Sequence, residues 1–364
     1  MATIKAVINS AYSIRKYEGA NYNPIIINAA GEFDSYSEEL KKKNIEVINL
    51  RNSNYINYLP KYGFLRSRFS YFIIFFISFF PLLKVLNNYN NRSNYFIVHL
   101  ISILPLILSF FFKFDLKFIL RISGYPKLTF FRKTLWKFFL KKFYLITCPT
   151  KSTHELLIKS NIVDYDKIIT LNDPIICIEE IKLRNKTFVR KKDNILSIGR
   201  LTKQKNFIFL IKAFKNPIFL KKKLLIIGEG EDRKKLSDSI LKIGSNHNVD
   251  LLGYKNNVFN YLCDAECFIL SSLWEDPGFV LIEAAYSRTP IISSDCPHGP
   301  SEFLDNGNNG YLFKTNNLED FISTYKKFEN DDYKNIQLKL LKALKKAKNY
   351  TLFRHYKNLS KILI

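Results

Sequence analysis

The sequence predicts an α/β protein made of two doubly wound domains joined by a linker. Short apolar runs alternate with helical segments along the whole chain, a pattern typical of parallel strands with crossover helices. Near residues 181–193 this pattern gives way to a charged segment, after which a second series of strands and helices begins. At 364 residues, the chain is long enough for two domains of ordinary size.

The first predicted domain covers residues 1–180, the linker covers 181–193, and the second domain begins at residue 194. Ligands of doubly wound sheets bind at the carboxyl ends of the strands, so two facing domains would hold theirs in a central cleft. The predicted strands are NPIIINAAGEF, IEVINL, YFIVHL, KFILRISG and FYLITCPT, then NILSIGRL, KLLIIGEG, VDLLGY, CFILSS and PIISSD.

The composition indicates an anionic partner. The 56 Lys and Arg outnumber the 32 Asp and Glu, for a formal net charge of +24. This suits nucleic acid, an acidic membrane or a phosphate-bearing substrate. An AT-rich gene, which favours Lys, Asn, Ile, Phe and Tyr together, explains the charge equally well.

The five cysteines show no paired framework, and Cys263 and Cys267 lack the second pair or histidine of a zinc site. We therefore expect five buried thiols in a reducing cytosol. The N-terminus lacks the basic-then-apolar pattern of a signal peptide.

Two apolar stretches bear on membrane attachment. Residues 69–86 hold an apolar run of about 15 residues that contains Pro81, shorter than the roughly 20 that a spanning helix needs. Residues 95–112 are better explained as a buried strand, a turn and a buried helix. We expect no transmembrane helix, and the first stretch suits either an anionic membrane surface or the core. The basic residues that precede it are Lys61, Arg66 and Arg68.

The stretch WEDPGFVLIEAA leaves the end of a predicted strand. Asp276 suits a helix N-cap and Pro277 the first helical position, so the amides of residues 278–280 would form an anion site. Glu275 lies on the loop beside them. Glu283, about two turns into the helix, would accept hydrogen bonds from sugar hydroxyls. Taken alone, the stretch is also explained as a capped helix with one surface glutamate.

The stretch SIGRLTKQKN places Arg200 and Lys205 just after a buried strand. Two cations there suit a diphosphate and would stabilise the charge of a departing phosphate. In so basic a chain they are also explained as solvated charges. LLIIGEGEDRKKL contains a G-x-G pair, but its glutamates would repel phosphate, which favours a tight turn. His99 ends an apolar strand, where a histidine is more often structural than catalytic.

Together these stretches resemble the donor domain of glycosyltransferase family 4, retaining enzymes with the GT-B fold. The resemblance runs in family order over about residues 194–313, through ILSIGRLTKQKN, LLIIGEGED, VDLLGY, WEDPGFVLIEAA and SSDCPHGPSEFLDNGNNGYLF. It implies two Rossmann-like domains facing a central cleft, with the donor domain at 194–345 and the acceptor in the first domain. Residues 346–364 resemble the family's C-terminal helix, which crosses back to the first domain.

The resemblance also implies residue roles, because Glu275 and Glu283 match the family's E-x7-E motif. Glu275 would contact the donor sugar near the developing oxocarbenium ion, and His99 matches a family histidine that approaches the same sugar. The nucleotide base would lie near the loop after Gly253. The family needs no metal or cofactor, and the leaving phosphate is thought to help deprotonate the acceptor. The implied donor-binding residues are Arg200 and Lys205 for the diphosphate, Glu283 for the ribose, and Gly278, Phe279 and Val280 for sugar and phosphate.

Two departures from the family pattern stand out. Glu-Asp-Pro-Gly-Phe replaces the commoner Glu-Gly-Phe-Pro, which moves the glycine but keeps the helix start. Family members open with a strand and a glycine-rich loop, whereas MATIKAVINSAYSIRKY already has the pattern of the first helix. The first strand of the N-terminal domain is therefore predicted to be missing.

We expect transfer of a sugar from a nucleotide diphosphate donor, UDP rather than GDP, with retained anomeric configuration. DCPHGPSE resembles members acting on bacterial surface polysaccharide or lipopolysaccharide, which implies a lipid-linked or polysaccharide acceptor. We expect a cytoplasmic location, with peripheral attachment to an anionic inner membrane, and no nucleic-acid partner. The alternatives are a sugar-nucleotide epimerase, a non-catalytic truncated remnant that binds nucleotide sugar or membrane glycan, and a nucleic-acid binder indicated only by charge.

Overall fold

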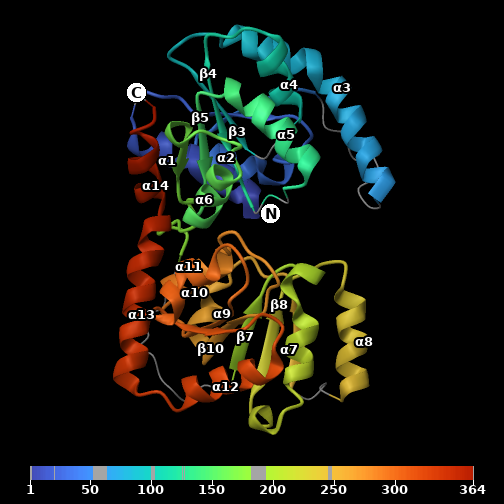
Figure 1. The fold of residues 1–364 in the computed structure, drawn as a ribbon, viewed down its shortest axis with the longest axis vertical. Coiled ribbons are helices and arrows are strands. Elements are labelled where there is room, and N and C mark those ends of the chain that lie inside the picture. Colours follow the sequence, from blue (N-terminus) through green and yellow to red (C-terminus); the bar gives the residue numbers. More distant parts are fainter. Residues whose placement is uncertain are drawn as a thin grey trace. The chain divides into compact units, whose positions relative to one another are not determined.

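The chain divides into two compact units (Figure 1). Unit 1 comprises Met1–Pro174 and Leu352–Ile364, and unit 2 comprises Ile175–Thr351. The boundary therefore falls before the predicted linker, and the return to unit 1 begins at 352 rather than 346. The computed structural model describes residues 2–19, 21–51, 64–99, 103–124, 126, 128–181, 194–244 and 248–363, so most of the predicted linker lies outside the described residues.

Unit 2 is built on one six-stranded parallel sheet in the order β12-β11-β10-β7-β8-β9. Its first strand, β7, lies at the centre, and later strands are added outward on both sides, which is the doubly wound arrangement. All five predicted strands are confirmed, and β12 was missed. The strands are β7 (Asn194–Ile198), β8 (Lys223–Ile227), β9 (Val249–Gly253), β10 (Cys267–Leu270), β11 (Ile291–Ser294) and β12 (Tyr311–Phe313).

Successive side chains of β7 point to opposite faces of this sheet, and a hydrophobic core lies on each face. Ile195 packs in a core with residues of α7, α8 and α12, whereas Leu196 and Ile198 pack with residues of α9, α10 and α13. Helices therefore cover both faces (Figure 1). The helices are α7 (Phe207–Ala213), α8 (Arg233–Ile243), α9 (Phe259–Asp264), α10 (Phe279–Tyr286), α11 (Pro300–Phe303), α12 (Leu318–Glu329) and α13 (Tyr333–Ala347).

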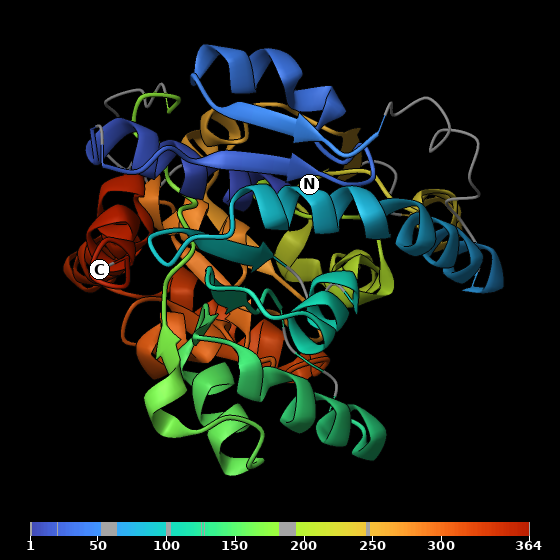
Figure 2. The ribbon, with the colours of Figure 1, turned by 90° about the horizontal axis from the view of Figure 1, so that it is seen from above.

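The strands of unit 1 form two separate parallel sheets, β1-β2 and β3-β4-β5-β6. Figure 2 shows β1 and β2 side by side near the N-terminus. The five predicted strands are confirmed, and the short strand β6 was missed. The strands are β1 (Ile25–Asn28), β2 (Glu46–Asn49), β3 (Tyr95–His99), β4 (Lys117–Arg121), β5 (Leu145–Cys148) and β6 (Ile168–Thr170).

Helix α1 joins the two sheets of unit 1 and is the first element of the described residues, as MATIKAVINSAYSIRKY predicts. Ile8 packs in a core with Ile26 of β1, and Ile14 packs in another with Ile119 of β4. Within the described ranges, β1 pairs only with β2 and β3 only with β4. That a family strand is missing between them stays a prediction. The helices are α1 (Ala2–Tyr17), α2 (Ser37–Lys42), α3 (Phe64–Asn88), α4 (Ile103–Phe111), α5 (Phe130–Phe139), α6 (Lys151–Lys159) and α14 (Leu352–Leu359).

The two apolar stretches fold into helix and strand within unit 1. Residues 95–112 form β3 and the largely buried α4, as predicted. The first stretch differs, because α3 continues through Pro81 as one helix of 25 residues. In the described part of the chain, Phe69–Asn88 is the one helical segment long and apolar enough to cross a membrane, with mean hydropathy 2.1 and 17% buried. Core helices pass the same test of length and composition, so the expectation of no transmembrane helix stays a prediction. The side chains of Lys61, Arg66 and Arg68 lie outside the described residues.

None of the five cysteines, all of which lie in the described residues, forms a disulfide, and four of them are buried. The exception corrects the prediction of five buried thiols. Cys263 is only half-buried, because the short helix α9 turns Leu262 into the core and the next side chain points about 100° away.

Candidate functional site

The loop after β7 positions Lys205. After Gly199 the chain forms a short 3₁₀ helix, Lys203–Lys205. The aliphatic stem of Lys205 lies so close to Gly199 that a Cβ added there would be 2.9 Å from Lys205 Cε. A larger residue at 199 would therefore displace the lysine from the carboxyl end of the strand.

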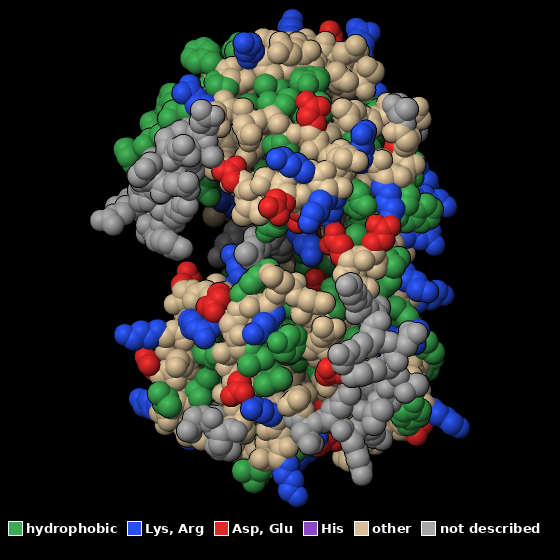
Figure 3. Space-filling model, turned by 180° about the vertical axis from the view of Figure 1, so that it is seen from behind, with side chains coloured by type: hydrophobic (Ala, Val, Ile, Leu, Met, Phe, Trp, Pro, Cys, Tyr) green, Lys and Arg blue, Asp and Glu red, His purple; other side chains and the backbone are tan. Residues whose placement is uncertain are grey.

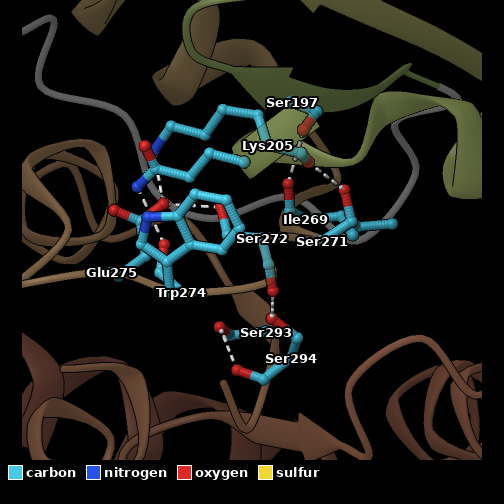
Figure 4. Close-up of polar contacts among 10 residues, drawn as sticks. Ser197, Lys205, Ile269, Ser271, Ser272, Trp274, Glu275, Ser293 and Ser294 are labelled. Carbon is cyan, nitrogen blue, oxygen red and sulfur yellow. Dashed lines mark hydrogen bonds and ion pairs between the residues drawn. The ribbon is translucent and has the colours of Figure 1, made fainter. Parts of the chain in front are cut away.

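Lys205 forms a buried ion pair with Glu275, which follows β10 (Figure 4). Their side chains are only 14% and 6% exposed. Ser272 Oγ donates a 2.5 Å hydrogen bond to Glu275 Oε1, the same oxygen that Lys205 Nζ contacts. A carboxylate removed from water costs several kcal/mol unless a cation and hydrogen bonds compensate it, and both are present here.

Serines at the strand ends hold the two loops in place (Figure 4). Ser271 Oγ donates to the carbonyl of Lys205 at 2.9 Å, and Ser294 Oγ at the end of β11 donates to the carbonyl of Ser272 at 2.7 Å. All three serines are buried. The sequence analysis missed them, although the polar pairs in CFILSS and PIISSD, at the ends of apolar strands, were a usable signal.

The loops are also joined by a reciprocal pair of hydrogen bonds. The side-chain amide of Gln204 donates to the carbonyl of Trp274, and the N–H of Leu273 donates to the carbonyl of Gln204, each at 2.8 Å. Together with the ion pair, these contacts fix the loop after β7 against the loop after β10.

Helix α10 begins two residues later than the sequence predicts. Its N-cap is Gly278, with φ 91° and ψ 80°, and Phe279 is the first helical residue, so Asp276 and Pro277 lie in the preceding loop. This left-handed conformation favours glycine, which decides where the helix starts. A Cβ on Gly278 would lie 3.6 Å from Glu275 Oε2, which places the carboxylate beside the helix start.

The first-turn amides of α10 belong to Phe279 and Val280. Such amides lack acceptors within their own helix and, with the helix dipole, attract anions. Glu283 is the fifth helical residue, a little over one turn in rather than two, and shares a half-buried stripe with Phe279 and Val280. The structure thus brings Lys205, Glu275 and the start of α10 together in unit 2.

The remaining predicted donor residues lie on neighbouring loops of unit 2. Arg200 lies two residues after the end of β7, and its side chain is exposed. The G-x-G stretch ends in a tight turn, as predicted, because the N–H of Arg233 donates to the carbonyl of Gly230 at 3.2 Å. Glu229 of this stretch pairs with Arg233 at 2.8 Å beside Gly253.

His99 lies in unit 1, where it ends β3 as predicted. It is the register partner of Arg121 on β4, and Arg121 forms a buried ion pair with Asp173. Burial, together with the nearby charge of Arg121, holds the pKa of His99 well below its usual value.

His355 of α14 shares this buried environment. Its Nδ1 donates to the carbonyl of Asn172 at 2.8 Å, so its Nε2 accepts from Ser10 Oγ at 2.9 Å. Burial, with the charge of Arg121, lowers the pKa of His355 to about 3. Both histidines are therefore neutral at pH 7.

Two parallel α/β units, of which unit 2 is doubly wound, are the architecture of the GT-B fold. HepE of Anabaena, solved in complex with UDP, shares the fold with a TM-score of 0.74 at 14% identity, over 100% of this chain and 96% of that one. Residues 179–350, a little under half of the chain, match the model of the family Glycosyl transferases group 1. The assignment of the chain to family 4 stays a prediction.

Two relatives show how far the sequence similarity extends. An uncharacterized glycosyltransferase of Methanocaldococcus jannaschii is 32% identical over 228 residues, 56% of this chain and 55% of that protein. The N-acetylgalactosamine-N,N'-diacetylbacillosaminyl-diphospho-undecaprenol 4-alpha-N-acetylgalactosaminyltransferase of Campylobacter jejuni is 31% identical over 176 residues, 47% of this chain and 46% of that protein. The chain thus matches about half the length of these relatives.

Proposed function

We propose that this protein transfers a sugar from a nucleotide diphosphate sugar to the hydroxyl of an acceptor. The observation that carries the proposal is the buried pair of Lys205 and Glu275 beside the start of α10. The ammonium group and the helix amides suit a diphosphate, and the carboxylate suits the sugar attached to it. The UDP bound to HepE favours UDP over GDP as the donor nucleotide.

In this proposal an arriving diphosphate takes over the ammonium group of Lys205, with Arg200 adding a second cation from the same loop. Glu275 is thereby released towards the donor sugar, where positive charge develops as the bond to phosphate breaks. Glu283 accepts hydrogen bonds from the ribose hydroxyls. His99, neutral at pH 7, approaches the sugar from unit 1.

The sugar keeps its anomeric configuration in the proposed reaction. The leaving phosphate accepts the proton of the acceptor hydroxyl on the face from which it departs, so Glu275 need not act as a general base. Lys205, Arg200 and the amides of residues 278–280 provide the charge stabilisation, and the proposal includes no metal.

The proposed acceptor is lipid-linked or a surface polysaccharide. The diphospho-undecaprenol in the name of the Campylobacter jejuni relative supports a lipid-linked one. Such an acceptor would place the protein in the cytoplasm, peripherally attached to the inner membrane. The second candidate is a non-catalytic remnant that binds nucleotide sugar, since β1 and β3 belong to separate sheets in the described residues.

The first test is thermal stability with and without UDP or GDP. Ligand at about 100 times its dissociation constant adds roughly 2.7 kcal/mol of stability. We expect UDP to stabilise the wild type but not Arg200→Ala. Lys203→Ala, which removes an exposed lysine from the same loop, is the matched control and should retain the shift. If neither nucleotide stabilises the folded protein, the assigned donor site is wrong.

Product formation separates the enzyme from the remnant. Incubation of a panel of UDP-sugars with an undecaprenyl-diphosphate-linked sugar as the acceptor should release UDP in the presence of EDTA. NMR of the glycosylated acceptor should show the donor's anomeric configuration. A UDP shift without turnover of any UDP-sugar would favour the remnant.

A further inference from the structure

Helix α3 presents a row of phenylalanines to solvent. Phe72, Phe76 and Phe80 lie four residues apart and are 63%, 56% and 75% exposed. On the opposite face, Leu82 and Leu86 are 4% and 1% exposed and belong to the core of unit 1. The helix is therefore apolar on both faces, and only one of them is covered.

Ring contacts extend this surface over α4 and α5. The ring centroid of Phe79 on α3 lies 6.3 Å from that of Phe112, just after α4. The ring centroid of Phe110 on α4 lies 4.7 Å from that of Phe138 on α5. Figure 3 shows hydrophobic side chains gathered along the edge of unit 1 that carries α3. Six of the exposed phenylalanines of these three helices make up what we name the aromatic face: Phe72, Phe76, Phe80, Phe111, Phe131 and Phe138.

The same part of the chain carries more than half of the net positive charge. Residues 51–150 contain 15 Lys and Arg and a single acidic residue, Asp115, so they supply +14 of the formal net charge of +24. Asp115 is itself within 3.8 Å of Arg92. The cations whose side chains are exposed on or next to the three helices include Lys84, Lys113, Lys137, Lys141 and Lys142.

We propose that the aromatic face docks unit 1 onto a bilayer that contains anionic lipids. Phenylalanine rings enter the boundary between headgroups and acyl chains, while lysines beside them remain with anionic headgroups. Docking does not depend on the proposed sugar transfer, since these residues are separate from Lys205 and Glu275.

The charge and the core contacts exclude the other arrangements of this face. Two copies of it would bring these exposed lysines against one another, with Asp115 as the one acidic residue in the sequence 51–150, which disfavours self-association. A spanning α3 would have to withdraw Leu82 and Leu86 from the core of unit 1. The helix therefore lies along the membrane surface.

Vesicle flotation tests the docking with phosphatidylcholine alone and with about 30% phosphatidylglycerol. The variant Phe72→Ser/Phe76→Ser/Phe80→Ser should bind the anionic vesicles on the order of 100-fold more weakly than wild type. The matched control, Leu241→Ser/Leu338→Ser/Leu341→Ser, removes three leucines exposed on unit 2 and should bind as wild type does. Lys137→Gln/Lys141→Gln/Lys142→Gln should lose most of the preference for anionic over neutral vesicles.

Circular dichroism shows whether each variant is folded, and thermal stabilisation by UDP shows whether it retains its donor site. Failure of docking and failure of the proposed function are therefore distinguishable. Three results would overturn the docking: equal loss in the leucine control, unchanged binding by the phenylalanine variant, or equal binding to neutral and anionic vesicles. Protein that resists both high salt and alkaline carbonate would establish a spanning helix instead. A dimer that the phenylalanine variant abolishes, without loss of vesicle binding, would make the face a self-interface.

Discussion

The two units differ in the middle of their sheets. In unit 2, β7 lies between β10 and β8 and joins six strands into one sheet. In unit 1, the strands form two separate sheets, β1-β2 and β3-β4-β5-β6, with no described strand between them. Helix α1 packs against both sheets. The central strand of unit 2 also carries the loop with Lys205. A continuous sheet thus fixes the loops of unit 2 against each other, whereas unit 1 depends on side-chain packing.

The difference is open to measurement because the chain has two tryptophans, one in each unit. Trp136 is buried on α5, and Trp274 lies in the site loop of unit 2. In Trp136→Phe the remaining fluorescence reports on unit 2, and in Trp274→Phe it reports on unit 1.

The largest expected effect is the loss of Lys205. In Lys205→Ala the buried Glu275 carboxylate keeps only Ser272, so the free energy of unfolding of unit 2 should fall by about 3–5 kcal/mol. Urea unfolding followed by Trp274 should show this, while the transition seen by Trp136 stays in place. Lys205→Met/Glu275→Leu should recover most of the stability. A loss below about 1 kcal/mol would mean that the pair is not buried in solution.

Hydrogen exchange should distinguish the two separate sheets of unit 1 from the continuous sheet of unit 2. Alternate amides of β1 and β3 face the edges that no described strand covers, so they should exchange at least about 100-fold faster than the amides of β7. NMR or mass spectrometry resolves these segments. Equal protection would show that something outside the described residues covers the edges of β1 and β3.

Acid should weaken unit 1 through two histidines, the half-buried His99 and the fully buried His355. The folded-state pKa values of His99 and His355 lie below the unfolded value of about 6.5, so only the unfolded chain takes up these protons as the pH falls. The contribution to stability is complete above about pH 6.5 and is lost below it, by about 1.4 kcal/mol per pH unit for each histidine. The groups facing His355 are Arg121, His99, Asn172 and Ser10.

Urea unfolding at pH 7 and pH 5, followed by Trp136, measures this loss. His355→Gln should reduce the difference between the two pH values by roughly 2 kcal/mol. A pH difference unchanged by the substitution would contradict the assignment of a neutral, buried His355.

The smallest effect belongs to Ser272. Ser272→Ala removes the 2.5 Å hydrogen bond to Glu275 and should cost unit 2 about 1–2 kcal/mol, with Ser272→Thr restoring part of it. Ser239→Ala on α8, whose hydroxyl donates to a carbonyl on an exposed surface, is the matched control and should cost less than about 0.5 kcal/mol. Equal losses for the two serines would remove the special role of Ser272.

The sequence predicted the elements better than it predicted the site. Ten strands follow from short apolar runs, whereas β6 and β12, at three residues each, leave too little pattern to distinguish them from loops. The start of α10 was misplaced because Pro277 is a good first helical residue, but the left-handed Gly278 after it decides the boundary.

Site residues were identified singly and not as contacts. Lys205 and Glu275 were predicted as separate ligand-binding residues, yet in the structure they bind each other. Ser271 and Lys205 are 66 residues apart in the chain, and their hydrogen bond exists only because parallel strands end at one edge of the sheet. Residue spacing alone carries no information about such contacts.

The return of the chain to unit 1 has a consequence for biosynthesis. Leu359 and Leu363 complete a core with Ile14 and Ile119, and His355 binds Ser10. On the ribosome, most of unit 1 is made first, but it lacks these partners until residues 355–363 have left the exit tunnel. Unit 2, which is continuous in the chain, has all its residues earlier. Domains usually fold in order from the N-terminus, but here unit 2 can complete its fold before unit 1 does. The incomplete unit 1 must therefore stay free of aggregation until its C-terminal segment is made.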